Sequence, residues 1–133
     1  MSVKKKNICS TEGVEVMASP RFSEEYSNAS LNKFIFEYDI HITNNSAFSL
    51  KLISRKWEII DSFGSKRSVS GEGVVGQQPE FGNGDTFSYS SWCPLSTPIG
   101  LMRGSFLMQR EIDGSIIEVL VPDMLLVANF IHN

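Results

Sequence analysis

The sequence has few cysteines and no long apolar run, and both absences narrow the possible classes of protein. Its two cysteines, Cys9 and Cys93, are too few for a disulfide framework, which favours a reduced, cytoplasmic compartment. The most apolar stretch, Val119 to Ile131, is interrupted by polar residues and proline, and it falls short of the ~20 residues that span a bilayer. The start, Met1 to Ser10, is positively charged but lacks the apolar segment of a secretory signal. We therefore expect a cytoplasmic protein with no membrane partner.

Basic charge and helical periodicity are also scarce. The 133-residue chain has a formal net charge of −3 at pH 7, and its basic run is Lys4–Lys6. Because nucleic-acid-binding domains usually carry a basic patch, we expect no nucleic acid among the partners. Residues 1–12 are expected to form a flexible tail. Ser23–Leu31 is the best candidate for a helix, and it reads equally well as a loop.

Aromatic residues and strict alternation are what the sequence does contain. It has nine Phe, two Trp and three Tyr, which are types that suit half-buried sheet surfaces. From Phe34 to Thr43 apolar and polar residues alternate, with Ile35 as the exception. Such a segment predicts a strand with one buried and one solvated face, and this is typical of an antiparallel sheet.

Further strands are expected along the chain, separated by turn residues. A strand over residues 48–61 changes phase near Ser54–Lys56, which indicates a bulge. Asp113–Gly114 is a hairpin signal between the last two strands. The other expected strands span residues 14–18, 86–91, 104–110 and 115–121. With no repeat and no linker, we predict one domain over residues 1–133, an all-β antiparallel sandwich of the fibronectin type III or immunoglobulin-like kind.

Several blocks of sequence occur in an order that resembles a known family. The blocks are Ser54–Asp61, Val69–Pro79, Phe87–Ser91, Cys93–Leu95, Thr97–Gly100, Met102–Phe106 and Ile117–Pro122. Together they resemble the ApaG domain over roughly residues 14–127. The resemblance implies a fibronectin type III-like β-sandwich and a family without an established enzymatic reaction.

The resemblance also implies a biological setting. Bacterial members of the family are associated with cobalt resistance and magnesium efflux, and their genes often accompany diadenosine tetraphosphate hydrolases. In eukaryotes similar domains are appended to F-box proteins and to proteins that interact with polymerase delta, which implies protein recognition. This sequence has Lys56 where the family usually has His, Trp92 where Gly is usual, and Gly82–Asp85 in place of a Pro-Gly-Glu-like turn. A tryptophan in place of glycine either blocks a pocket or creates a contact surface.

The segment Gly71–Gly76, called the glycine-rich loop below, fits the G-x-G-x-x-G pattern. In dinucleotide sites these glycines open a helix whose N-terminus faces the pyrophosphate, but here Gln77–Pro79 lead into a turn. Two interpretations stay open. The loop amides bind a small anion, or the glycines allow a positive φ and close backbone approach. The residues of the candidate anion site are Gly71, Gly73, Gly76, Arg55, Lys66 and Arg67.

The residues that could bind a metal or act in catalysis also have simpler structural explanations. Glu37, Asp39 and His41 alternate on one strand face and are the candidate ligands for a divalent cation, although a polar outer face explains them equally well. Cys93 has no evident base to activate it. We expect no metal, no cofactor and no enzymatic activity.

Trp92 is the candidate centre of an interaction surface. Trp57 lies in an apolar strand and is expected in the core, whereas Trp92 stands near a strand end, before a segment stiffened by two prolines. Exposed aromatic residues at such places are frequent anchors in protein interfaces. The residues of the predicted surface are Trp92, Pro94 and Pro98, joined by Arg55 and the glycine-rich loop.

Two functions fit these observations. The leading hypothesis is a non-catalytic binding module that recognises a protein partner. The alternative is a binder of phosphate- or pyrophosphate-containing ligands, such as nucleotide polyphosphates, through the glycine-rich loop. A direct role in cation homeostasis would require ion binding at Glu37, Asp39 and His41. The sequence does not distinguish a monomer from a homodimer.

Overall fold

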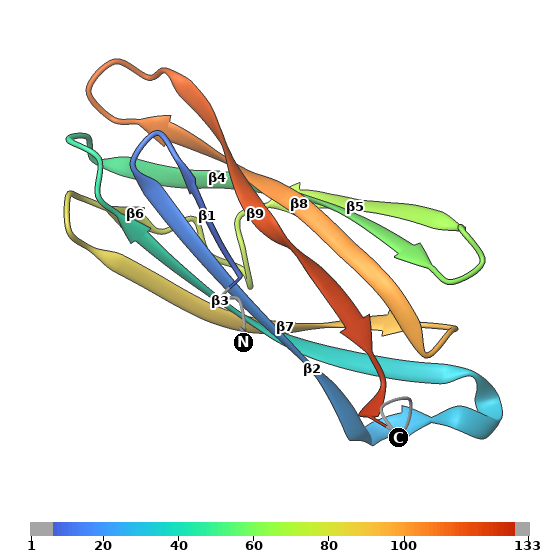
Figure 1. Ribbon diagram of the computed structural model, residues 1–133. Helices are drawn as coiled ribbons and strands as arrows, with labels where there is room; N and C mark the ends of the chain where they lie inside the picture. Colours follow the sequence, from blue (N-terminus) through green and yellow to red (C-terminus); the bar gives the residue numbers. More distant parts are fainter. Residues whose placement is uncertain (1–6, 130–133) are drawn as a thin grey trace.

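The computed structural model describes residues 7–129, and most of this part of the chain is β-strand (Figure 1). The elements are β1 (Ile8–Thr11), β2 (Val14–Asn28), the 3-10 helix η1 (Ala29–Leu31), β3 (Lys33–Asn44), β4 (Leu50–Asp61), β5 (Lys66–Glu72), β6 (Glu80–Phe81), β7 (Thr86–Leu95), β8 (Ile99–Arg110) and β9 (Ile116–Val127). Sheet A has the strand order β1-β2-β3-β7, and sheet B has the order β5-β4-β8-β9 with β6 paired to β4. All pairings between these strands are antiparallel.

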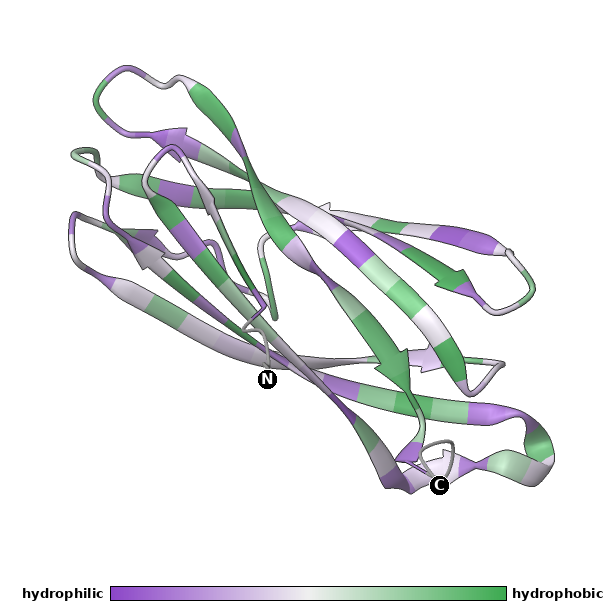
Figure 2. Cartoon of the chain, in the orientation of Figure 1, coloured by the Kyte–Doolittle hydropathy of each residue, from purple (hydrophilic) through white to green (hydrophobic). Residues whose placement is uncertain are grey.

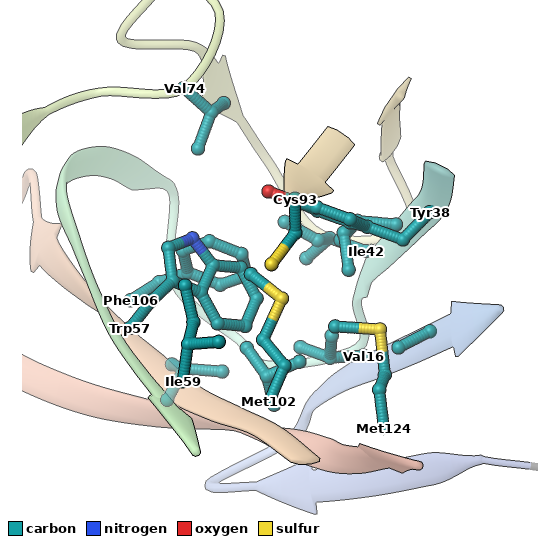
Figure 3. Packing of buried hydrophobic residues seen from close by; sticks show 14 of the residues in the cluster. Val16, Tyr38, Ile42, Trp57, Ile59, Val74, Cys93, Met102, Phe106 and Met124 are labelled. Atoms are coloured by element: carbon teal, nitrogen blue, oxygen red, sulfur yellow. The ribbon is translucent and has the colours of Figure 1, made fainter. Parts of the chain in front are cut away.

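The two sheets pack face to face around one hydrophobic core, which confirms the predicted antiparallel sandwich. Hydrophobic and hydrophilic residues alternate along most of the strands (Figure 2), so these strands turn one face inward. Trp57 of sheet B lies edge-on to Tyr38 of sheet A and to Phe106, with ring centroids 5.6 and 6.1 Å apart (Figure 3). Trp57 is 2% exposed, as predicted. Burying a large aromatic side chain contributes roughly 1.5–3 kcal/mol.

Ile35 breaks the alternation of β3 because the outer face of sheet A carries a small apolar site of its own. Although Ile35 lies on the outward side of the strand, it is only 5% exposed. The pairing of β2 with β3 shifts between Ser23 and Asn28, and this shifted end of β2 supplies Tyr26, which lines the same pocket as Ile35. The backbone N–H of Ile35 donates to Ser27 Oγ at 2.8 Å.

Two predicted segments are corrected by the structure. The sequence predicts a tail over residues 1–12, but Ile8–Thr11 form β1 and pair with Val14–Met17 of β2; residues 1–6 lie outside the described residues. Cys9 stands opposite Val16, whose complete burial anchors this hairpin at the edge of the core. Ser23–Leu31 is the end of β2 followed by η1 rather than a helix or a loop throughout.

Two prolines lie inside strands, and the strand β5 is one that the sequence-based prediction lacks. Pro94 is the penultimate residue of β7, whereas Pro122 lies in the middle of β9. Pro122 stands beside a register shift between Met102 and Gly104, where the ladder of β8 and β9 is already irregular. The strand β5 is absent from the sequence-based prediction, because six of its seven residues are exposed and it shows no apolar alternation.

Candidate functional site

Arg55 and the glycine-rich loop lie together, as the sequence predicts. The Nη1 atom of Arg55 donates hydrogen bonds to the backbone carbonyls of Glu72 at 3.0 Å and Gly73 at 2.9 Å. Its guanidinium group also lies against Gly71, 3.1 Å from where a β-carbon would stand. This cation therefore fixes the end of β5 and the start of the loop.

The glycines of this loop meet specific backbone demands. Gly73 has a φ of +60°, and a β-carbon there would stand 2.1 Å from the carbonyl oxygen of Gln77. The amide of Gly73 donates to the Ile53 carbonyl at 2.8 Å, and the amide of Val74 donates to the Gln77 carbonyl at 2.8 Å. Val74 is fully buried and holds the loop against the core (Figure 3). No helix follows the loop, as expected, and the amides of Gly73 and Val74 already have backbone acceptors.

Lys66 and Arg67 lie at the opposite end of β5 from Gly71. Arg67 stands opposite Ile59 in the ladder, whereas Gly71 stands opposite Arg55. The Nη2 atom of Arg67 donates to the Pro94 carbonyl and reaches Cys93 Sγ at 3.6 Å, so this side chain bridges the two sheets. The candidate cations therefore occupy two separate places along the ladder between β4 and β5.

The buried thiol of Cys93 is poorly placed for nucleophilic chemistry. Cys93 is 2% exposed. Burial raises the pKa of its thiol, although the nearby Arg67 guanidinium acts in the opposite direction. A nucleophilic cysteine needs a low pKa and solvent access, and neither condition holds here.

Trp92 lies on the outer face of sheet A, beside a pocket of about 420 Å³. Trp92 is 61% exposed and Tyr26 is 59% exposed, and both line this pocket with the buried Ile35. Lys33 and Glu37 supply one charge of each sign. This group of residues, called the Trp92 pocket below, combines two aromatic rings, one buried apolar side chain and two side chains of opposite charge.

The predicted surface is only partly assembled around Trp92. Pro94 is exposed on the same side of β7 as Trp92, two residues further along the strand. Pro98 lies in the turn before β8, half-buried, and its carbonyl accepts a hydrogen bond from the Ala128 amide at 2.9 Å. Arg55 contacts the loop at the end of β5 and is not among the residues that line the Trp92 pocket.

The candidate metal ligands are engaged with neighbouring side chains. Arg21 donates from Nε to Glu37 at 3.1 Å and from Nη1 to Asp39 at 2.7 Å. A hydrogen bond from Ser90, together with Arg21, holds the pKa of Asp39 below its usual range despite some desolvation. His41 Nδ1 contacts Ser88 Oγ. Within residues 7–129 no three His, Cys, Asp or Glu side chains are grouped to hold a metal ion.

A second concave region, missed by the sequence, lies on the outer face of sheet B. This groove has a volume of about 830 Å³ and combines residues from β1, β4, β5, β8 and β9. Two pairs of its polar groups contact each other: Arg103 lies 3.9 Å from Glu58, and Ser105 donates to Glu118 at 2.7 Å. No local motif could reveal the groove, because its walls come from strands far apart in the sequence.

In the described part of the chain, no helix is long and apolar enough to cross a membrane.

The fold places the chain in the class of small fibronectin type III-like β-sandwich domains. The sequence model of the ApaG domain matches residues 24–110, and the chain belongs to the ApaG domain family. Protein ApaG of Methylobacterium nodulans is 45% identical over 112 residues, which cover 84% of this chain and 85% of that protein. Protein ApaG of Rhizobium leguminosarum bv. trifolii is 42% identical over the same length, with the same coverage. The crystal structure of an ApaA protein from Bordetella pertussis has a TM-score of 0.83 and 39% sequence identity, covering 93% of this chain and 97% of that one.

Proposed function

We propose that this ApaG-family domain is a non-catalytic recognition module that binds a protein partner through the outer face of sheet A. The observation that carries the proposal is the exposed Trp92 beside a preformed pocket. A tryptophan in a paired strand loses little conformational freedom on binding and offers a large contact area. Such residues commonly supply most of the binding energy of an interface.

The pocket next to Trp92 suits a mixed side chain of a partner. Its Ile35 floor and Tyr26 wall favour an apolar stem, while Glu37 and Lys33 can receive a polar tip of either sign. Glu37 is already bonded to Arg21, so it is held in place before a partner arrives. The non-catalytic part of the proposal is supported by Cys93, which is buried and has a raised thiol pKa.

Photo-crosslinking tests this proposal while the identity of the partner is still open. Benzoylphenylalanine is placed at Trp92, and in a matched chain at Ile112, which is 78% exposed in the turn between β8 and β9 at the opposite end of the sandwich. Crosslinked proteins from a lysate of the source organism are identified by mass spectrometry and then titrated as purified proteins. Trp92→Ala is expected to weaken binding at least ~10-fold, with Ile112→Ala unchanged. Equal affinities for the two variants would reject the proposed face.

The alternative proposal is a binder of phosphate- or pyrophosphate-containing ligands at the glycine-rich loop. The contact of Arg55 with Gly71 and Gly73 supports it, because a fixed cation and a glycine backbone lie side by side. It requires the Arg55 hydrogen bonds to be shared with or surrendered to the ligand. NMR titration with pyrophosphate, ATP and a diadenosine polyphosphate tests this: saturable shifts confined to Gly71–Gly76 and Arg55 support the anion site, and unchanged spectra remove it.

A role in cobalt resistance or magnesium efflux is proposed to act through the protein partner rather than through direct ion binding. This proposal is supported by the hydrogen bonds that already engage Glu37 and Asp39 with Arg21. Equilibrium dialysis with Co²⁺ and with Mg²⁺ provides the test. Stoichiometric binding that is lost in His41→Ala would contradict it.

A further inference from the structure

Apart from the two-residue β6, each sheet of the described residues has two edge strands, and three of these four edges carry features that oppose further pairing. The strand β5 begins with Lys66 and ends with Glu72, and all but one of its residues are exposed. The strand β1 has only four residues. The edge strand β9 lies beside β1, where the amide of Leu120 donates to Thr11 Oγ at 3.2 Å. Charge, shortness and coverage are the usual means by which sheet edges avoid pairing.

The fourth edge, β7, lacks these features along most of its length, although Arg67 of the other sheet contacts it near its end, at Pro94. It is ten residues long, from Thr86 to Leu95, and contains no charged residue. It pairs with β3 on one side and forms the margin of sheet A on the other (Figure 1). A long, uncharged edge strand is a template for the addition of another strand.

The ladder determines which backbone groups of β7 face outward. The amide of Asn44 donates to the Asp85 carbonyl at 3.0 Å, so the odd-numbered residues of β7 exchange hydrogen bonds with β3. The even-numbered residues point their backbone groups to the free edge, and the Pro94 carbonyl accordingly accepts from Arg67 of the other sheet. The outward-facing set is Thr86, Ser88, Ser90, Trp92 and Pro94. All except Pro94 also carry an N–H.

We propose that a second copy of this chain pairs antiparallel with β7 and joins two A sheets into one continuous sheet. The register that uses every outward N–H places Thr86 opposite Trp92 of the second copy and Ser88 opposite Ser90 of the second copy. It leaves Pro94 and its bond to Arg67 outside the ladder. A second copy is the occupant that the charge pattern favours, because two uncharged strands pair without like-charge repulsion and a two-fold contact makes the same patch self-complementary.

The pairing itself follows from the edge of β7, but its consequence for function rests on the proposed recognition through the Trp92 pocket. The two-fold axis falls near Tyr89, three residues from Trp92, so the two Trp92 pockets lie on the same side of one sheet about 20 Å apart. Two identical pockets at fixed separation bind a repeated or dimeric partner more tightly than either pocket alone. The dimer would therefore be a bivalent recognition surface.

Sedimentation velocity over a range of protein concentrations tests the pairing. The wild-type chain is compared with Ser90→Pro and Ser90→Ala. Both variants lose the Ser90 bond to Asp39, but only proline removes the outward N–H, and the β3 ladder does not use that N–H. A two-fold dimer loses two hydrogen bonds in Ser90→Pro, so the association constant is expected to fall about 30-fold, while Ser90→Ala remains dimeric.

A second variant covers the case in which Ser90→Pro does not fold. Ser88→Lys brings a positive charge to the shared edge in each copy and leaves the backbone intact, so it is expected to give a folded monomer by circular dichroism and sedimentation. The pairing is overturned if the wild-type chain stays monomeric at the highest concentration. It is also overturned if Ser88→Lys dimerises like the wild type, or if Ser88 and Ser90 amides gain exchange protection only when a different protein is added.

The two proposals can fail separately. A wild-type monomer whose Trp92 position still crosslinks a partner rejects the dimer and leaves the recognition face. A dimer in which Trp92→Ala and Ile112→Ala bind the partner equally rejects the recognition face and leaves the pairing of β7.

Discussion

The guanidinium group of Arg55 lies against Gly71, only 3.1 Å from where a β-carbon would stand. Glycine at this position in β5 lets the cation pass over the strand and reach the backbone carbonyls beyond it. A sequence pattern that suggests a phosphate site thus has a structural role, because it lets Arg55 hold the end of β5 and the start of the glycine-rich loop.

Replacing Arg55 by alanine is expected to destabilise the fold and loosen the glycine-rich loop. The change removes two charge-assisted hydrogen bonds to backbone carbonyls, which corresponds to a loss of roughly 2–3 kcal/mol in the free energy of unfolding. Urea unfolding measures the loss, and amide exchange at Gly73 reports the loop. The control is Lys56→Ala, an exposed neighbour, which should change stability by less than about 0.5 kcal/mol. Equal effects of the two substitutions would contradict the role given to Arg55.

Two glycines of the loop should respond very differently to alanine. Gly76 has a φ of +80° with open space around it, so Gly76→Ala should cost only the backbone penalty of about 1 kcal/mol. Gly73→Ala adds a clash with the Gln77 carbonyl and should cost more than ~3 kcal/mol or prevent folding. Thermal unfolding of the two variants provides the comparison. A Gly73→Ala protein as stable as Gly76→Ala would show that the loop has another conformation.

The two tryptophans should differ in accessibility. Trp57 is 2% exposed and Trp92 is 61% exposed, so iodide is expected to quench mainly the emission of Trp92. In Trp92→Phe the remaining fluorescence should be almost insensitive to iodide, with a loss of stability of about 1 kcal/mol at most, because the side chain is largely in solvent. Strong quenching in Trp92→Phe would contradict the buried position of Trp57.

The partly buried Tyr89 should make the free energy of unfolding depend on pH in the alkaline range. Its hydroxyl is buried without a hydrogen-bond partner, and burial raises the pKa of this phenol, with a smaller contribution from Tyr38 and an opposing one from Arg55. Because the folded form holds the proton more tightly than the unfolded form, the stabilisation is present below the ordinary tyrosine pKa of about 10 and is lost as pH rises above it. Tyr89→Phe removes this loss and leaves no buried unpaired hydroxyl.

The measurement for Tyr89 is urea unfolding on both sides of this pH. At neutral pH Tyr89→Phe should be as stable as the wild type or more stable, because an unpaired buried hydroxyl is costly. Above pH ~10 it should lose less stability than the wild type. A large loss at neutral pH would mean that the hydroxyl has a partner such as a buried water.

The sandwich and much of its core could be predicted because alternation is a local property of the sequence. The strand β3 shows this best, since its buried side chains Phe36, Tyr38, Ile40 and Ile42 follow one another at a spacing of two. The strand β5 escapes prediction because an exposed edge strand needs no apolar face. The burial of Ile35 cannot be explained by its own strand, because Tyr26, from the shifted end of β2, lines the same pocket.

The residue types of the candidate site could be predicted from the sequence, but the contacts that these residues make could not. The sequence indicates an exposed Trp92 and a contact between Arg55 and the glycine-rich loop, and the structure has both. It could not show that Arg55 binds carbonyls of its own chain, because that depends on the register between β4 and β5. The open margin of β7 is equally hidden, since it follows from a strand order fixed by long-range pairing.

Amide hydrogen exchange along β7, measured by NMR at a concentration where the chain is monomeric, tests most directly whether the edge of sheet A beside the Trp92 pocket is open. Tyr89 and Ser91 should be protected by their bonds to β3, while the outward amides of Ser88, Ser90 and Trp92 should exchange rapidly. This alternation would establish an open, uncharged edge beside the Trp92 pocket. Equal protection of the Ser88 and Ser90 amides in the monomer would show that the edge is already covered, and it would contradict the availability of β7 for pairing with a second copy.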